Sequence, residues 1–296
     1  MSSNYPTPPP QGHAEVADAS GNPLLPAGLL QRSFHVATVA GIPIRLHALF
    51  PAFILIATVF GFLPPATMEQ GVLHMLVFGP VLFLTVLLHE LGHCAATKMV
   101  GGDVHGILLW PLGGLAFIGH SGDALDDLKV SIAGPLTHVP QSLAWLLLLA
   151  ASNEGDVTLG VTGNFWADLC RYAIVINISL CVFNLFVPAY PLDGGRIFAS
   201  ILLLCGISVP TAAAVTAYVS IFLGLLIVAL GVYLMQFLTI FVGGWVLVQA
   251  NELYKLVQAG RADLHPTFAK YANSPQGGGG SGVDGGIAGA LGGGRV

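Results

Sequence analysis

The stretch VLLHELGHCA, Val86 to Ala95, places two histidines and a glutamate inside a strongly apolar segment. Residues four apart lie on one face of a helix, so His89 and His93 can offer two imidazole nitrogens to one metal ion. Glu90 can then reach a metal-bound water, which makes this the helical zinc-binding pattern of metallohydrolases. A chance match is the alternative, but burying a glutamate in a membrane helix costs several kcal/mol. The surrounding leucines and valines therefore predict a metal site within a membrane.

The composition supports a membrane protein. The chain has 296 residues, of which 54% are hydrophobic and only 8% charged, whereas soluble domains carry about a quarter charged residues. The ten lysines and arginines form no basic run, which leaves no electrostatic footprint for nucleic acid. The four cysteines have no CxxC spacing, so they predict packing residues and no disulfide framework.

Apolar runs predict the membrane topology, because one crossing needs about 20 mostly apolar residues. We expect an all-α integral membrane protein with six transmembrane helices, at 46–63, 71–99, 130–151, 172–192, 210–231 and 232–250, and a short apolar helix at 197–206. The segment LLWPLGGLAFI, Leu108–Ile118, is too short to span. It predicts a re-entrant hairpin or loop between the second and third helices, with an edge that could pair with an unwound substrate.

The distribution of basic residues predicts the orientation and the domain boundaries. With a cytoplasmic N-terminus, every lysine and arginine except Arg171 falls on the cytoplasmic side, as the positive-inside rule requires. Six crossings then place both termini in the cytoplasm. We expect a disordered Pro-rich arm at 1–40, a membrane domain at 41–255 and a short Gly-rich cytoplasmic tail at 256–296.

A third metal ligand is expected because a catalytic zinc usually has three protein ligands. Asp193, in VPAYPLDGGR, is the only carboxylate between Asp168 and Glu252. Prolines and glycines break the helix there, and broken backbone at membrane depth is tolerated where it lines a cavity. The alternative is an Asp-Gly turn residue, but its pairing with HELGH favours a ligand.

Several segments resemble the site-2 protease family of intramembrane zinc metalloproteases. They are GIPIRLHALF (Gly41–Phe50), LLHELGHCAATKMVGG (Leu87–Gly102), LLWPLGGLAFIG (Leu108–Gly119), SIAGPLTHV (Ser131–Val139) and NLFVPAYPLDGGRIF (Asn184–Phe198). The resemblance implies one zinc per chain, held by His89, His93 and Asp193, with Glu90 as general base. It also implies cleavage of transmembrane protein substrates in the lipid bilayer, after an upstream site-1-type protease has trimmed them.

The sequence departs from the family pattern at three places. Asn184, the candidate for binding substrate or the oxyanion, lies nine residues before Asp193 where eight are usual, with Val187 resembling an insertion. Asn177, two helical turns earlier, is the reserve for this role. His138 stands where asparagine is common, and we expect it to have a hydrogen-bonded packing role outside the ligand set. Nucleotide-sensing CBS domains, frequent in relatives after the last span, are not expected here.

Two other functions fit parts of the pattern. A metal transporter could use His89, His93 and Asp193 as a transport site, although Glu90 has no required place in it. A proteolytically inactive scaffold of the same fold is the second alternative, which the complete HELGH and LDGG motifs disfavour.

Overall fold

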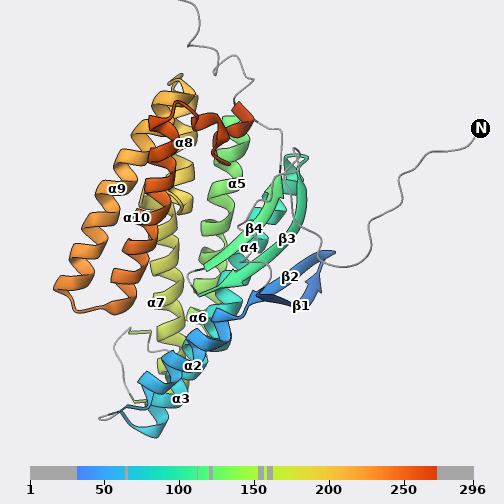
Figure 1. The fold of residues 1–296 in the computed structure, drawn as a ribbon. Helices are drawn as coiled ribbons and strands as arrows, with labels where there is room; N and C mark the ends of the chain where they lie inside the picture. The colour runs from blue at the N-terminus through green and yellow to red at the C-terminus, as the bar shows by residue number, and fades with distance from the viewer. Residues whose placement is uncertain are drawn as a thin grey trace, which may run out of the picture. The chain divides into compact units, whose positions relative to one another are not determined.

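A computed structural model describes residues 32–63, 66–111, 113–119, 123–152, 157–158 and 163–271 (Figure 1). Most of the predicted N-terminal arm and the Gly-rich end of the predicted tail lie outside these residues. The chain forms two compact units, one of residues 1–122 and 129–184 and the other of residues 123–128 and 185–296.

The helices of the first unit carry the apolar runs predicted from the sequence. They are α2 (Leu49–Gly61), α3 (Met68–Leu76), a π-helical turn η1 (Val77–Val81), α4 (Leu82–Met99), α6 (His138–Ser152) and most of α5 (Ala124–Leu136) and α7 (Phe165–Phe186). A capping box between Thr67 and Gln70 starts α3, where it satisfies backbone donors that the helix itself cannot. Helix, π-turn and helix then run continuously from Met68 to Met99, which places the HELGH motif in the last third of a long apolar path.

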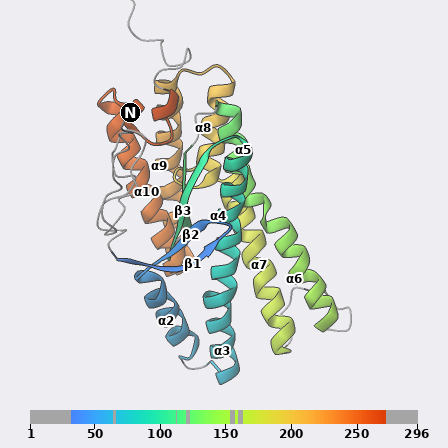
Figure 2. The same cartoon turned by 90° about the vertical axis from the view of Figure 1, so that its right-hand side faces the viewer.

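A four-stranded sheet in the first unit lies against α4. Its strands, in the order β1-β2-β3-β4, are β1 (Ser33–Val39), β2 (Ile42–His47), β3 (Asp103–Trp110) and β4 (Gly113–Gly119). The pairs β1–β2 and β3–β4 are antiparallel, and β2–β3 is parallel. Ile107 and Leu109 of β3 form a core with Val86 and Cys94 of α4, so β3 packs alongside α4 (Figure 2).

The sheet corrects part of the predicted fold. The mostly helical membrane architecture is confirmed, but the fold is not all-α. The strand β1 also begins at Ser33, inside the predicted arm of residues 1–40. β1 pairs with β2 in a local hairpin, but the parallel partner of β2 begins only at Asp103, and hydropathy runs do not reveal a pairing between segments so far apart in sequence.

Five helical segments are long and apolar enough to cross a membrane. They are Met68–Met99, Ala124–Ser152, Phe165–Phe186, Val209–Tyr233 and Phe237–Gln258. Each overlaps a predicted crossing. The remaining predicted crossing, 46–63, contains α2 with only 13 residues, or about 20 Å of helix, because β2 takes up its first residues. The chain is therefore a multi-pass membrane protein with five clear candidate spans among its described residues.

The second unit is built on a helical hairpin. It contains α8 (Asp193–Leu204), α9 (Val209–Tyr233) and α10 (Phe237–Gln258), and α9 and α10 lie side by side in both views (Figures 1 and 2). A Cβ atom on Gly231 would lie 2.7 Å from the backbone nitrogen of Ile240. Glycine therefore allows close approach near the turn, where the sequence predicted the division between the two spans.

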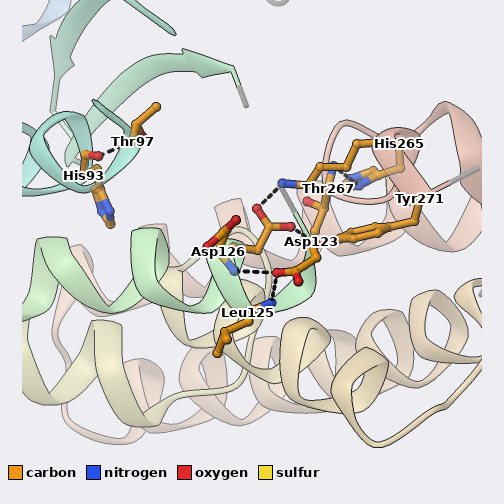
Figure 3. A network of polar contacts seen from close by, with 10 residues as sticks. His93, Thr97, Asp123, Leu125, Asp126, His265, Thr267 and Tyr271 are labelled. Carbon is orange, nitrogen blue, oxygen red and sulfur yellow. Dashed lines mark hydrogen bonds and ion pairs between the residues drawn. The ribbon is translucent and has the colours of Figure 1, made fainter. Parts of the chain in front are cut away.

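A folded segment follows α10 where the sequence predicted a tail. The short turns η2 (Ala262–Leu264) and η3 (Ala269–Tyr271) bury Phe268 and Tyr271 in a core with α8 and α9. Asp127 accepts hydrogen bonds from Lys270 and Tyr271. Asp123 caps the start of α5 by accepting hydrogen bonds from two backbone amides (Figure 3). The two hydrogen bonds to Asp127 hold the segment against the start of α5.

Candidate metal centre

The HELGH motif presents two imidazoles on one buried face of α4. His89, Glu90 and His93 are all buried. The ring centroids of the two histidines lie 4.8 Å apart with planes nearly perpendicular, and their Nε2 atoms are 3.2 Å apart. The helical spacing therefore brings the predicted pair together as the sequence pattern requires.

Hydrogen bonds at the opposite side of each ring determine its tautomer. His93 donates from Nδ1 to the carbonyl oxygen of Val130 at 2.7 Å. The Nδ1 atom of His89 lies 3.0 Å from Nε2 of His138, whose own Nδ1 lies 3.0 Å from Oδ1 of Asn177. Because Asn177 donates through Nδ2 to the carbonyl of Ala173, its Oδ1 accepts from His138, and Nε2 of His138 accepts from His89.

This pattern fits a bound cation. With the proton on Nδ1 of both His89 and His93, both Nε2 atoms carry lone pairs. Two lone pairs at 3.2 Å repel each other unless a cation lies between them. Two nitrogens at about 2.0–2.1 Å from one tetrahedral zinc are themselves about 3.3–3.4 Å apart. The pair therefore has the chemistry and the spacing of two zinc ligands.

Two glycines allow α4 and α5 to pack closely at the histidines. A Cβ atom on Gly92 would lie 2.7 Å from the carbonyl oxygen of Ala133, and one on Gly134 would lie 2.2 Å from Nε2 of His93. Small residues permit this backbone approach between helices in membranes. The glycine within HELGH and the glycine of the AGPL segment thus both allow the close contact between α4 and α5.

The strand β4 forms a wall beside Glu90. A Cβ atom on Gly114 would lie 2.3 Å from Cγ of Glu90 and 2.5 Å from its Oε1. Any larger residue at Gly114 would displace the glutamate. The segment predicted as a hairpin or loop therefore passes directly next to the candidate general base.

Asp193 lies at the start of α8 in the second unit. Its carboxylate is buried in the first turn of the helix, where the positive end of the helix dipole favours a negative charge. The preceding loop is packed onto this turn, because a Cβ atom on Gly195 would lie 2.3 Å from the backbone nitrogen of Tyr190. Ser220 of α9 accepts a 2.7 Å hydrogen bond from the same nitrogen. The glycine thus allows the loop to pack closely onto the first turn of α8.

The two candidate asparagines differ in their surroundings. Asn177 is fully buried, and both ends of its amide are engaged, by His138 on one side and by Ala173 and Thr85 on the other. This leaves it poorly placed to bind an oxyanion. Asn184 is half-buried near the end of α7 and lies on the same face, two turns further on. Val187, which resembles an insertion, lies in the loop after α7 and outside the helix that carries Asn184.

The fold and the histidine pair define a multi-pass membrane protein with a metallohydrolase-type site. Residues 77–230, just over half of the chain, match the model of Peptidase family M50. The chain belongs to this family.

Known relatives support this assignment. The chain is 34% identical over 173 residues to "Zinc metalloprotease MJ0392" of Methanocaldococcus jannaschii, covering 57% of this chain and 45% of the relative. It is 30% identical over 188 residues to "Putative zinc metalloprotease Rip3" of Mycobacterium tuberculosis, covering 59% and 45%. The chain thus spans less than half the length of these curated relatives. The solved structure "Site-2 Protease from Methanocaldococcus jannaschii" matches with a TM-score of 0.53 and 27% identity, over 74% of this chain and 94% of that one.

The hydrogen bonds of His138 were only partly anticipated. The sequence predicted a hydrogen-bonded packing role, and His138 is indeed buried and hydrogen-bonded. What the sequence did not reveal is that its partner is the predicted zinc ligand His89. The only available signal was its place in the GPLTH motif, where asparagine is common.

Proposed function

We propose that this protein is an intramembrane zinc metalloendopeptidase that hydrolyses peptide bonds within or next to transmembrane helices of membrane-tethered proteins. The observation that carries this proposal is the pair of Nε2 atoms, 3.2 Å apart, next to a buried glutamate in a helical segment apolar enough to span a membrane. The proposal assigns His89 and His93 as two zinc ligands and Asp193 as the third. All three are side chains of kinds that hold zinc.

Glu90 is the proposed general base. Bound zinc would polarise the scissile carbonyl and lower the pKa of its water to about 7. Glu90 accepts the proton of the attacking water and passes it to the departing amine nitrogen. Its position against Gly114 restricts the carboxylate to one side of α4. Asn184 is the proposed donor to the substrate carbonyl or the oxyanion.

The strand β4 is the proposed binding site for an unwound substrate. It is an outer strand of the sheet, and its Gly114 lies against Glu90. An extended segment paired with β4 by main-chain hydrogen bonds would bring a scissile carbonyl close to the base. A helical substrate must unwind for this, because its carbonyls are otherwise hydrogen-bonded within the helix.

The proposed topology has six crossings, with α2 as a short first crossing and the β3–β4 hairpin re-entering the membrane. Both termini then lie in the cytoplasm, and Arg171 is the one basic residue on the opposite side. Cleavage after an upstream protease has trimmed the substrate belongs to the same proposal.

The test compares wild-type protein with Glu90→Gln, using a reporter transmembrane peptide and zinc analysis of both. We expect cleavage by the wild type alone and about one zinc per chain in each. Zinc in both without cleavage by the wild type, against a panel of transmembrane peptides, would favour an inactive scaffold. Metal flux through vesicles that persists in Glu90→Gln would favour a transporter, and absence of zinc from both would refute the metal site.

A further inference from the structure

A chain of three buried polar side chains leads from α4 through α6 to α7. Nδ1 of His89 lies 3.0 Å from Nε2 of His138, and Nδ1 of His138 lies 3.0 Å from Oδ1 of Asn177. The side chains of His138 and Asn177 are almost completely excluded from solvent. A buried polar group without a partner costs about 1–3 kcal/mol, so each of these contacts constrains the next.

The direction of the hydrogen bonds is fixed from the Asn177 end. The amide nitrogen of Asn177 donates to the carbonyl of Ala173 at 2.9 Å, and Oγ1 of Thr85 lies 3.4 Å from the same nitrogen. Its Oδ1 therefore faces His138 and accepts a proton from Nδ1. Neutral His138 is left with an acceptor at Nε2, and this acceptor holds the proton of His89 on Nδ1.

The geometry excludes His138 as a further ligand of the same ion. It contacts the Nδ1 side of the His89 ring, whereas His93 faces the Nε2 side. The two nitrogens lie on opposite sides of an imidazole, so His138 and the metal position are separated by the His89 ring.

We propose that His138 is a positioning residue for zinc, which orients His89 and fixes it in the tautomer whose Nε2 binds the metal, with Asn177 as the terminal acceptor. This rests on the proposed zinc site. The two proposed zinc ligands then donate their Nδ1 protons to different kinds of acceptor. His93 donates to a backbone carbonyl of α5, while His89 donates to a neutral imidazole of α6. Partners of this kind typically contribute a factor of 10–100 to metal affinity.

The experiment measures zinc affinity of the purified full chain by chelator competition. His138→Met keeps a side chain of similar length without a strong acceptor, and we expect zinc binding about 10–100 times weaker. In His138→Gln, the side-chain oxygen can occupy the place of Nε2, so the affinity should return to within about threefold of wild type. His74→Met, at a histidine bonded to the backbone of its own helix, is the matched control and should bind zinc as the wild type does.

Asn177→Leu tests the far end of the chain without changing the contact with His89. It should weaken zinc binding less than His138→Met but measurably. Thermal unfolding of each metal-free variant separates loss of folding from loss of zinc. If His138→Met does not fold, wild-type affinity in His138→Gln together with weaker binding in Asn177→Leu supports the proposal.

The zinc measurements separate the positioning role of His138 from the existence of the zinc site. Folded His138→Met or Asn177→Leu with wild-type zinc affinity, or His138→Gln as weak as His138→Met, would overturn the positioning role while leaving the zinc site standing. A wild-type protein that binds no zinc would refute both.

Discussion

Replacing Gly134 by alanine sets two effects of known size against each other. Alanine within a helix is more favourable than glycine by about 1 kcal/mol, so α5 alone would become more stable. The new Cβ atom, however, would lie 2.2 Å from Nε2 of His93 and 2.4 Å from Cε1. Since ordinary non-bonded contacts begin at about 3.5 Å, the imidazole nitrogen must move by about 1 Å.

Movement of that size is incompatible with zinc ligation. Zinc–nitrogen distances vary by only about 0.2 Å between sites, and the two helices cannot easily separate because Gly92 also lies close to the backbone of Ala133. We expect Gly134→Ala to weaken zinc binding by at least about 100-fold, or about 2.7 kcal/mol. The metal-free protein should remain folded.

The assay is chelator competition on the purified protein, with Gly244→Ala as the matched control. A Cβ atom at Gly244, within α10, meets no atom within 4 Å, so this variant gains helix propensity without a clash. Wild-type zinc affinity in Gly134→Ala would show that the glycine serves only helix packing and that the His93 imidazole can move away from residue 134 without losing zinc.

Three further predictions concern the proposed base, the proposed third ligand and the segment after α10. Gly114→Ala should displace Glu90 and lower kcat by about 100-fold while zinc content stays at the wild-type level. Asp193→Asn should reduce zinc affinity by at least about 10-fold in the same chelator assay; unchanged affinity would remove it from the ligand set. Burial lowers the pKa of His265 to about 4, so its contribution to stability is complete above its unfolded pKa of about 6.5 and is lost as pH falls toward 4, by about 2 kcal/mol at pH 5. The rate of proteolysis or hydrogen exchange of residues 262–271 should therefore rise as the pH is lowered from 7 to 5 in wild type, but much less in His265→Phe. The same pH dependence of this rate in both proteins would contradict the prediction.

Local patterns predicted the features that depend on residues near each other in sequence. The spacing of His89 and His93 is a property of one helix, and five of the predicted crossings overlap helices of sufficient length and hydropathy. The break before Asp193 follows from the prolines and glycines around it, and α8 does begin at this residue. These predictions required only helical periodicity, hydropathy and backbone preference.

The complete four-stranded sheet and the folded segment after α10, which sequence analysis missed, depend on partners distant in sequence. The strand β1 pairs with β2, and this hairpin is continued by a strand that begins about 60 residues later. The segment after α10 folds because Tyr271 reaches both the α8–α9 core and Asp127. Nothing in the local composition of residues 256–271 distinguishes such a segment from a tail.

The polar chain behind His89 shows why a motif describes only half of a metal site. HELGH supplies the two histidines, but the tautomer in which both Nε2 atoms would bind zinc, as proposed, depends on hydrogen bonds to Val130, His138 and Asn177, which lie on three other helices. Each of these partners lies 37 or more residues from the motif histidine that it supports directly or through another side chain. A substitution in this set leaves the motif intact, yet it should alter zinc affinity as strongly as many changes beside the metal. Variants that retain HELGH can therefore differ in zinc affinity through residues outside that motif.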